Sequence, residues 1–153
     1  MSSKTKNKRK GIDIFLRVRP SKKSSNYWKI QDNQKVSFDV PIDSETTSRN
    51  KQSSHKFQFN HVLPMNAQQD EVFALVAATP ITSVMDGFNA TIFAYGNTGS
   101  GKTFTMVGSN DNTNDNTNAG DGLIPRACSR IFEECRARMV NGYDHVVRLC
   151  YLE

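Results

Sequence analysis

Gly96-Asn97-Thr98-Gly99-Ser100-Gly101-Lys102-Thr103 is the most informative stretch of this 153-residue chain. It fits the pattern G-x-x-x-x-G-K-[ST], whose glycines allow backbone N–H groups to surround a polyphosphate. In such a loop the lysine reaches the terminal phosphates and the hydroxyl of the last residue holds Mg²⁺. We therefore expect residues 96–103 to bind a nucleotide, with Lys102 at the phosphates and Thr103 at the metal. The alternative is a glycine-rich turn that only precedes a helix.

The segments on both sides of this loop suit a phosphate site. Residues 91–95 form a β-branched and aromatic run that predicts a buried strand, and residues 102–106 can begin a helix. A strand, a glycine-rich turn and a helix start are the geometry that the pattern requires. Spacing alone thus predicts purine-nucleotide binding with Mg²⁺.

Other strands and loops follow from the distribution of apolar residues. Strands are predicted where β-branched residues gather or apolar and polar residues alternate, at residues 12–20, 36–40, 57–59 and 145–153. Loops are predicted for the polar segments at residues 21–30, 42–55 and 109–122.

Two amphipathic helices are predicted from apolar residues at helical spacing. The first runs from an N-cap at Asn66 to Gly87, with a kink or a break near Ala78-Thr79 because Pro80 lies inside the pattern. The second carries an apolar stripe over residues 124–139, which we expect to face the core, with Pro125 at its first position. Strands and helices alternating around a phosphate loop indicate an α/β protein with a P-loop NTPase-like central sheet flanked by helices.

The net charge of +5 arises in the first ten residues, which hold five basic side chains and no acid. The remaining residues carry fifteen basic and fifteen acidic side chains. Residues 1–10 therefore predict a disordered basic tail, and no nucleic-acid partner is expected. No apolar run approaches the ~20 residues of a membrane span, and no secretory signal is visible. The three cysteines lack metal-ligand spacing and indicate reduced thiols in an intracellular protein.

Nucleotide hydrolysis needs more than a phosphate loop. A second acid, usually an Asp that follows an apolar strand, must organise Mg²⁺ and water. No such Asp follows Lys102, and Asp13 and Asp39 stand among alternating rather than continuous apolar residues. We therefore expect no catalytic residue within this chain.

Residues 87–106, which contain the phosphate loop, resemble the core signature of kinesin motor domains. Three further motifs occur in the order of that family. They are Arg17-Val18-Arg19-Pro20, similar to R-x-R-P; Gly122-Leu123-Ile124-Pro125-Arg126, similar to G-[IL]-I-P-R; and Cys150-Tyr151-Leu152-Glu153, similar to the start of S-Y-[FL]-E-I-Y. An unrelated P-loop enzyme such as a small kinase would not be expected to carry these three motifs. The motifs extend the resemblance over residues 11–153.

The resemblance implies roles that spacing leaves open. Arg17 and Pro20 would flank the adenine of ATP, and Phe104 would stack against the base, which suits an aromatic face. The cofactors would be ATP and Mg²⁺, and the partner would be the microtubule, which implies a cytoplasmic and cytoskeletal location. A weaker similarity to a ciliary subgroup would add the cilium or flagellum, and dimerisation is left open.

The main departure from the family is length, because kinesin motor domains are roughly twice as long as this chain. The two switch motifs and the main microtubule-binding helix have no counterpart here. We therefore expect residues 11–153 to be the N-terminal, nucleotide-binding half of a motor domain truncated at its C-terminal end. Such a chain would be inactive alone and would meet the microtubule through the missing half. The alternative is a truncated non-motor product with weak or no ATPase activity.

Overall fold

The computed structural model describes residues 11–21, 27–39, 54–109 and 120–150. The predicted basic tail, most of the loops predicted at 42–55 and 109–122, and the last three residues lie outside these ranges. The chain divides into two compact units, Met1–Asn66 and Ala67–Glu153.

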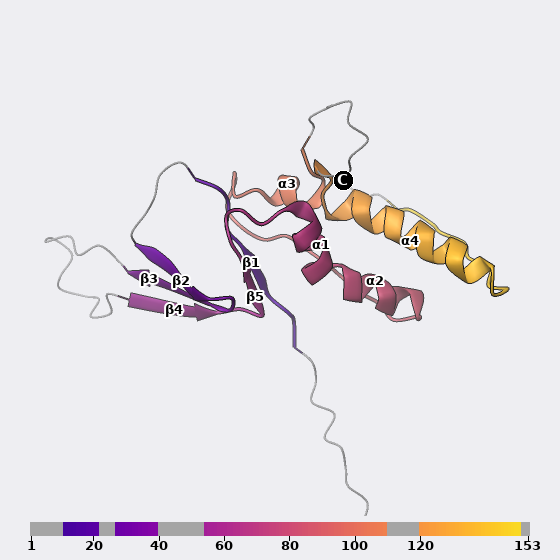
Figure 1. Cartoon of the computed structure of the whole chain (residues 1–153), viewed down its shortest axis with the longest axis horizontal. Helices are drawn as coiled ribbons and strands as arrows, with labels where there is room; N and C mark the ends of the chain where they lie inside the picture. Colours follow the sequence, from indigo (N-terminus) through magenta and orange to yellow (C-terminus); the bar gives the residue numbers. More distant parts are fainter. Residues whose placement is uncertain (1–10, 22–26, 40–53, 110–119, 151–153) are drawn as a thin grey trace, which may run out of the picture. The chain divides into compact units, whose positions relative to one another are not determined.

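The first unit contains two small sheets (Figure 1). Strand β1 (Phe15–Arg17) pairs in parallel with β5 (His61–Leu63). Strands β2 (Trp28–Asp32), β3 (Lys35–Asp39) and β4 (Ser54–Gln58) form an antiparallel sheet with β3 in the middle. Strand β5 is the most deeply buried of the five, because its last two residues are only 2% and 3% exposed.

Strands β1, β3 and β4 overlap predicted ranges but differ from them in length or in the faces they present, and β5 was not predicted. Strand β1 is shorter than expected, and β2 begins at Trp28, inside a segment predicted as a loop. The alternation expected in β3 is wrong at two positions, since Phe38 is 39% exposed and Ser37 only 6%. Ser37 stands opposite Lys29 and Lys56 on the neighbouring strands, where long aliphatic stems can shield a small side chain.

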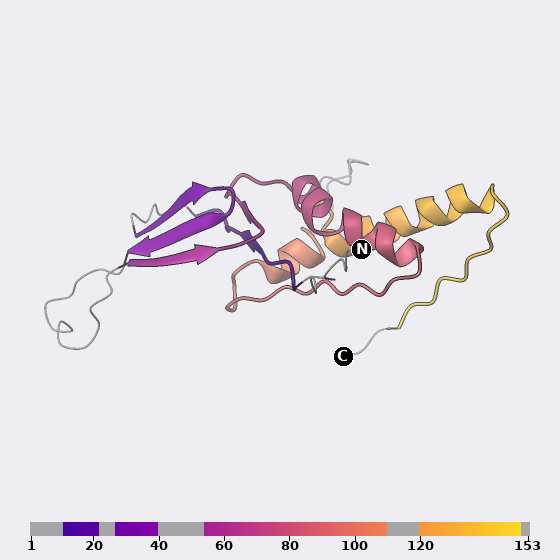
Figure 2. The same ribbon diagram turned by 90° about the horizontal axis from the view of Figure 1, so that it is seen from below.

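The described part of the second unit contains four helices. They are α1 (Gln69–Val76), α2 (Ala78–Met85), α3 (Lys102–Met106) and α4 (Leu123–Met139). Helix α2 runs beside α4 in both views (Figures 1 and 2). Buried residues of the helices and of their connections, among them Val72, Ala77 and Ile81, make up the core of this unit. No helix in the described ranges combines the length and the apolarity that crossing a bilayer would require.

The kink or break predicted near Ala78-Thr79 occurs as a break, one residue earlier than expected. Helix α1 ends at Val76 and α2 starts at Ala78, with Ala77 between them. Pro80 is the third residue of α2, a position whose N–H has no partner within the helix. The missing N–H of proline therefore costs no hydrogen bond there.

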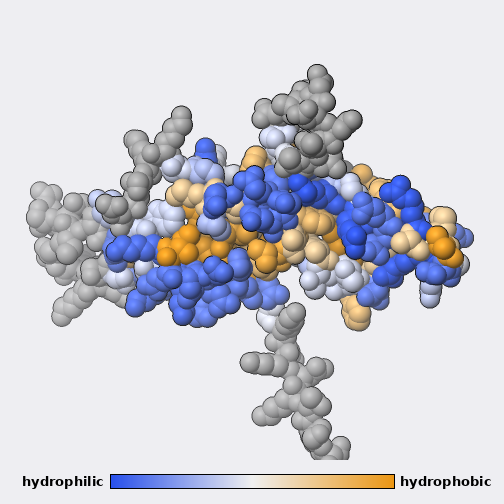
Figure 3. Space-filling view, in the orientation of Figure 1, coloured by the Kyte–Doolittle hydropathy of each residue, from blue (hydrophilic) through white to orange (hydrophobic). Residues whose placement is uncertain are grey.

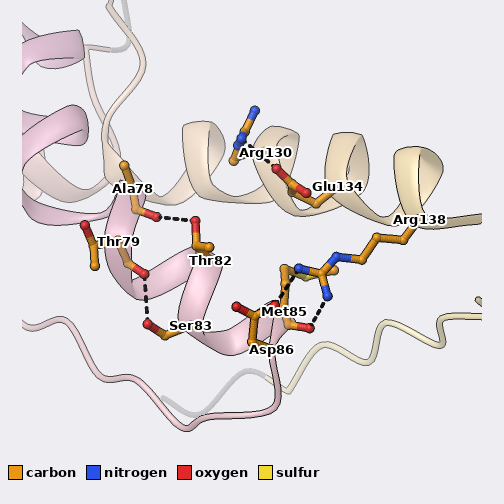
Figure 4. A network of polar contacts seen from close by, with 9 residues as sticks. All are labelled: Ala78, Thr79, Thr82, Ser83, Met85, Asp86, Arg130, Glu134 and Arg138. Carbon is orange, nitrogen blue, oxygen red and sulfur yellow. Dashed lines mark hydrogen bonds and ion pairs between the residues drawn. The ribbon is translucent and has the colours of Figure 1, made fainter.

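A polar network joins the end of α2 to α4 (Figure 4). The Arg138 guanidinium donates to the Met85 carbonyl at 2.6 Å and to the Asp86 carboxylate at 2.8 Å. The hydrogen bond to Asp86 is the main cause that raises the pKa of Arg138. A cation at this end of α2 also suits the negative end of the helix dipole.

Both predicted helix starts are displaced by about one turn or less. The N-cap of α1 is Gln68 rather than Asn66, and the Glu71 carboxylate accepts a hydrogen bond from the Gln68 N–H at 2.8 Å. Pro125 is the third residue of α4, since the helix begins at Leu123. Proline is tolerated at either place because the N–H groups of the first turn have no helical partner.

The apolar stripe of α4 is only partly covered. Within the stripe Cys135 is 9% exposed, whereas Ile124, Phe132 and Met139 remain about half exposed, at 49%, 51% and 57%; Leu123, just before the stripe, is 5% exposed. The expectation that this stripe is core thus holds for one flank of the helix. Figure 3 also shows apolar side chains at the surface among hydrophilic ones.

Two predicted strands are not formed. Residues 91–95 and 145–150 belong to no ladder, and side chains such as Phe93 and Tyr95 are 68% and 95% exposed. A strand needs a neighbour for its backbone N–H and C=O groups, and neither segment has one among the described residues. The α/β class is confirmed, as a partial arrangement of mixed sheets and helices.

Candidate phosphate-binding site

Residues 96–101 form a tight turn that leads directly into α3. The φ angles of Gly99 and Gly101 are 77° and 98°, in the left-handed region that a Cβ atom disfavours. The Ser100 N–H donates to the Asn97 carbonyl at 3.1 Å and closes the turn. Gly101 is the N-cap residue of α3. The backbone conformation therefore explains why glycine occupies both places, of which position 101 belongs to the pattern.

The Lys102 side chain lies against this turn. Its ammonium donates to the carbonyl oxygens of Gly96 and Asn97, both at 2.9 Å. These two bonds tie the start of the turn to the start of α3. They also keep a positive charge at the loop, where the pattern places the phosphates.

Thr103 is the second residue of α3, and its side chain is exposed. In the part of the chain that the structure describes, no cluster of His, Cys, Asp and Glu side chains could hold a metal by itself. Mg²⁺ commonly takes one or two protein ligands and completes its shell with water and substrate phosphates. The accessible Thr103 hydroxyl beside a phosphate loop fits that kind of binding.

Phe104 links the site to α1. Its side chain is 45% exposed, so the ring can meet a planar ligand. Its backbone carbonyl accepts a hydrogen bond from the Gln69 side-chain amide at 2.7 Å. Gln69 is only 4% exposed and was missed by the sequence analysis. The only sequence feature that marks Gln69 is its place in the first turn of an amphipathic helix. A glutamine amide at such a place is usually solvated, so this feature does not predict burial.

The end of α3 is fastened to the start of α4. The Gly122 N–H donates to the Val107 carbonyl at 3.0 Å, and the Ser109 N–H donates to the Gly120 carbonyl at 3.1 Å. A Cβ atom on Gly122 would lie 2.6 Å from the carbonyl carbon and oxygen of Met106. The two backbones approach so closely that only glycine fits without movement.

Arg17 and Pro20 belong to the first unit, at and after the end of β1. Arg17 lies opposite Leu63 in the parallel ladder, and the Val18 N–H continues the ladder by donating to the Leu63 carbonyl at 3.0 Å. Partial burial lowers the pKa of the Arg17 guanidinium. Pro20 is exposed. The predicted contact of both residues with adenine stays a prediction.

Two carboxylates near the described elements have structural partners. Asp13, weighed above as a candidate acid, accepts a hydrogen bond from the Asn60 amide at 2.8 Å, and the Asn60 amide oxygen accepts one from the Ile14 N–H at 2.7 Å. In the second unit, the Asp86 carboxylate is held by Arg138. These contacts give both acids a role in the fold.

A glycine-rich turn closed by its lysine and followed by a helix defines the class of phosphate-loop proteins. Within that class, residues 17–153 match the family model of the kinesin motor domain. The chain belongs to the kinesin motor domain family.

Curated relatives and a solved structure agree with this assignment. The kinesin-like protein KLP1 of Chlamydomonas reinhardtii is 38% identical over 147 residues, covering 95% of this chain and 18% of that protein. The kinesin-like protein KIF15 of Mus musculus is 38% identical over 133 residues, covering 86% of this chain and 9% of that protein. This chain therefore spans less than a fifth of these two relatives.

The solved structure is that of a fast kinesin, described as "Structure of a fast kinesin: Implications for ATPase mechanism and interactions with microtubules". It matches with a TM-score of 0.66 and 26% sequence identity. The match covers 82% of this chain and 33% of that chain. The likeness of fold thus extends over most of these residues and about a third of the fast kinesin.

Proposed function

We propose that residues 11–153 are the ATP-binding part of a microtubule-dependent motor ATPase. The observation that carries this proposal is the turn at residues 96–101, which is already closed by Lys102 and leads into α3. Family membership supplies the class of activity, and the related fast kinesin is described by an ATPase mechanism and interactions with microtubules. The location that follows is the microtubule cytoskeleton of the cytoplasm, with the cilium as a narrower case.

The roles proposed for the residues follow from their chemistry. Backbone N–H groups of residues 96–101 and the Lys102 ammonium would neutralise the phosphates of ATP. The Thr103 hydroxyl would hold Mg²⁺, which neutralises phosphate charge when bound. Phe104 would stack on the adenine, and Arg17 and Pro20 would flank it. Water activation and track contact would belong to parts of the motor outside these 153 residues.

The direct test is microtubule-stimulated ATP hydrolysis by the full-length motor. Lys102→Ala should abolish it, because the substitution removes both the phosphate contact and the two bonds that close the loop. Lys56→Ala is the matched control, since Lys56 is exposed on β4 and should leave turnover unchanged. Unchanged turnover in the Lys102 variant would refute the proposal.

A binding role without turnover is the second candidate for the 153-residue chain alone. It is favoured because Asp13 and Asp86 are engaged in structural contacts rather than placed for water activation. Phosphate release from ATP separates the two cases. The binding-only role predicts no release above the buffer rate, and turnover that Lys102→Ala abolishes would contradict it.

A further inference from the structure

Gln69 is a buried polar side chain, whereas the other buried side chains described in the second unit are apolar. It is 4% exposed, and Val72, one turn further along α1, is 1% exposed. A buried amide is costly unless its donors and acceptor are paired. Gln69 donates to the Phe104 carbonyl at 2.7 Å, a contact that spans 35 positions of sequence. The contact joins α1 to the helix that follows the phosphate loop.

The Gln69 side chain projects from a helix start that is stabilised by a cap. Gln69 is the first residue of α1, next to the N-cap Gln68. The Glu71 carboxylate accepts a hydrogen bond from the Gln68 N–H at 2.8 Å, which stabilises this first turn in the manner of a capping box. The Gln69 amide is therefore presented by a capped helix and not by a loose loop.

The hydrogen-bond ladder of α3 is irregular just beyond Phe104, the residue that Gln69 contacts. The N–H groups of Val107 and Gly108 both donate to the Thr103 carbonyl, at 2.7 and 3.4 Å. The Gly108 N–H thus bonds a carbonyl five residues earlier, a spacing that marks the end of a helix. The Gln69 amide supplies a donor at this place. A helix of five residues gains little stability from its own hydrogen bonds, so such a tether has a large share in holding it.

The two ends of α3 are held by different groups. At the start, Lys102 bonds the Gly96 and Asn97 carbonyls, and the Thr105 N–H donates to the Gly101 carbonyl at 2.9 Å. Beyond this start, the Gln69 contact fixes the backbone that carries the Phe104 ring. Loss of the Gln69 donor should therefore loosen the ring while the phosphate turn keeps its own bonds.

We propose that Gln69 is a positioning residue that orients Phe104 and thereby sets the preference of this site for a purine nucleotide over a bare polyphosphate. The assignment rests on the proposed function, because it takes Phe104 as the base-stacking ring. Gln69 itself need not touch the nucleotide. Its substitution should lower affinity only for ligands that carry a base.

The test compares two ligands on the 153-residue chain in the presence of Mg²⁺. ATP and inorganic tripolyphosphate each compete with a fluorescent ATP analogue. Gln69→Leu, which keeps the approximate volume but removes the donor, should weaken ATP binding roughly fivefold, as expected for one lost hydrogen bond. Tripolyphosphate binding should change less than about twofold. Gln58→Leu is the matched control, because Gln58 is exposed on β4 and the same replacement there should affect neither ligand.

A double-mutant cycle shows whether Gln69 acts through the ring. In a Phe104→Ala background, Gln69→Leu should no longer change ATP affinity, and a persistent loss would overturn the assignment. Equal losses for ATP and tripolyphosphate, or no loss for either, would overturn it as well. If circular dichroism shows that Gln69→Leu unfolds the chain, ATP and tripolyphosphate are compared instead on Gln69→Glu. A glutamate keeps the shape of the glutamine side chain but lacks the amide donor. Failure of the unsubstituted chain to bind either ligand would instead refute the proposed function, and the assignment with it.

Discussion

Gly122→Ala should weaken the connection between α3 and α4 and disturb the nucleotide site from a distance. The φ and ψ angles of Gly122 are −79° and −168°, which any residue can adopt, so the substitution tests space and not backbone strain. The added Cβ would lie 2.6 Å from the carbonyl carbon and oxygen of Met106 and from the carbonyl carbon of Val107. All three are backbone atoms, so a side-chain rotation cannot relieve the overlap.

The size of the effect follows from the distance that must be recovered. Ordinary contacts of a Cβ atom begin at 3.4 Å, so the two backbones must separate by nearly an ångström. This movement would stretch the hydrogen bond from the Gly122 N–H to the Val107 carbonyl, now 3.0 Å. Overpacking and a weakened hydrogen bond together should cost about 2–3 kcal/mol of unfolding free energy. At this chain length the thermal midpoint should fall by roughly 5–10 °C.

Gly120→Ala is the matched control, two residues earlier in the same connection. Its Cβ would meet the Ser109 Oγ at 2.5 Å, but a serine side chain can rotate away. We expect a loss below about 1 kcal/mol. Thermal unfolding followed by circular dichroism measures stability, and titration with a fluorescent ATP analogue measures the site. Equal losses of stability in the two variants would refute the reasoning, because backbone and side-chain obstacles would then be equivalent.

Two further substitutions test the contacts that shape each unit. Arg138→Met should lower the thermal midpoint more than Arg130→Met, because Arg138 bonds the Met85 carbonyl of another helix whereas Arg130 pairs with acids of its own helix. Similar midpoints would show that the link from α2 to α4 is dispensable. The Gln34 backbone N–H lowers the pKa of Asp32, so this carboxylate stabilises the fold above its ordinary pKa of 3.8. That contribution is lost as the pH falls through the lowered value. In Asp32→Asn, the free energy of unfolding should therefore fall less steeply as the pH is lowered into the acid range. An unchanged slope in that range would contradict this prediction.

Features that depend on local chemistry could be predicted from the sequence. Pro80 predicted the break between α1 and α2 because a proline acts on the turn that contains it. Gly101 was assigned to a sharp turn, and its φ of 98° is one that glycine adopts without strain. Family membership was equally accessible, because four short motifs occur in order along the chain.

Features that depend on distant partners could not be predicted. Residues 91–95 have the composition of a buried strand, yet Tyr95 is 95% exposed because no described strand pairs with the segment. The contact of Gln69 with Phe104 joins positions 35 residues apart, and no periodicity in either segment indicates it. The faces of β3 were also mistaken, since the burial of Ser37 depends on which residues stand opposite it in the neighbouring strands. Burial and ladder pairing are properties of the assembled fold, whereas turns and breaks are encoded where they occur.

The central claim is that residues 96–103 form a competent nucleotide cradle in this chain. Equilibrium titration of the 153-residue chain with a fluorescent ATP analogue tests it most directly, with and without Mg²⁺ and beside Lys102→Ala. We predict micromolar binding that weakens when Mg²⁺ is removed and is lost in the Lys102 variant. Binding that is absent, or that neither Mg²⁺ nor Lys102 affects, would contradict the account.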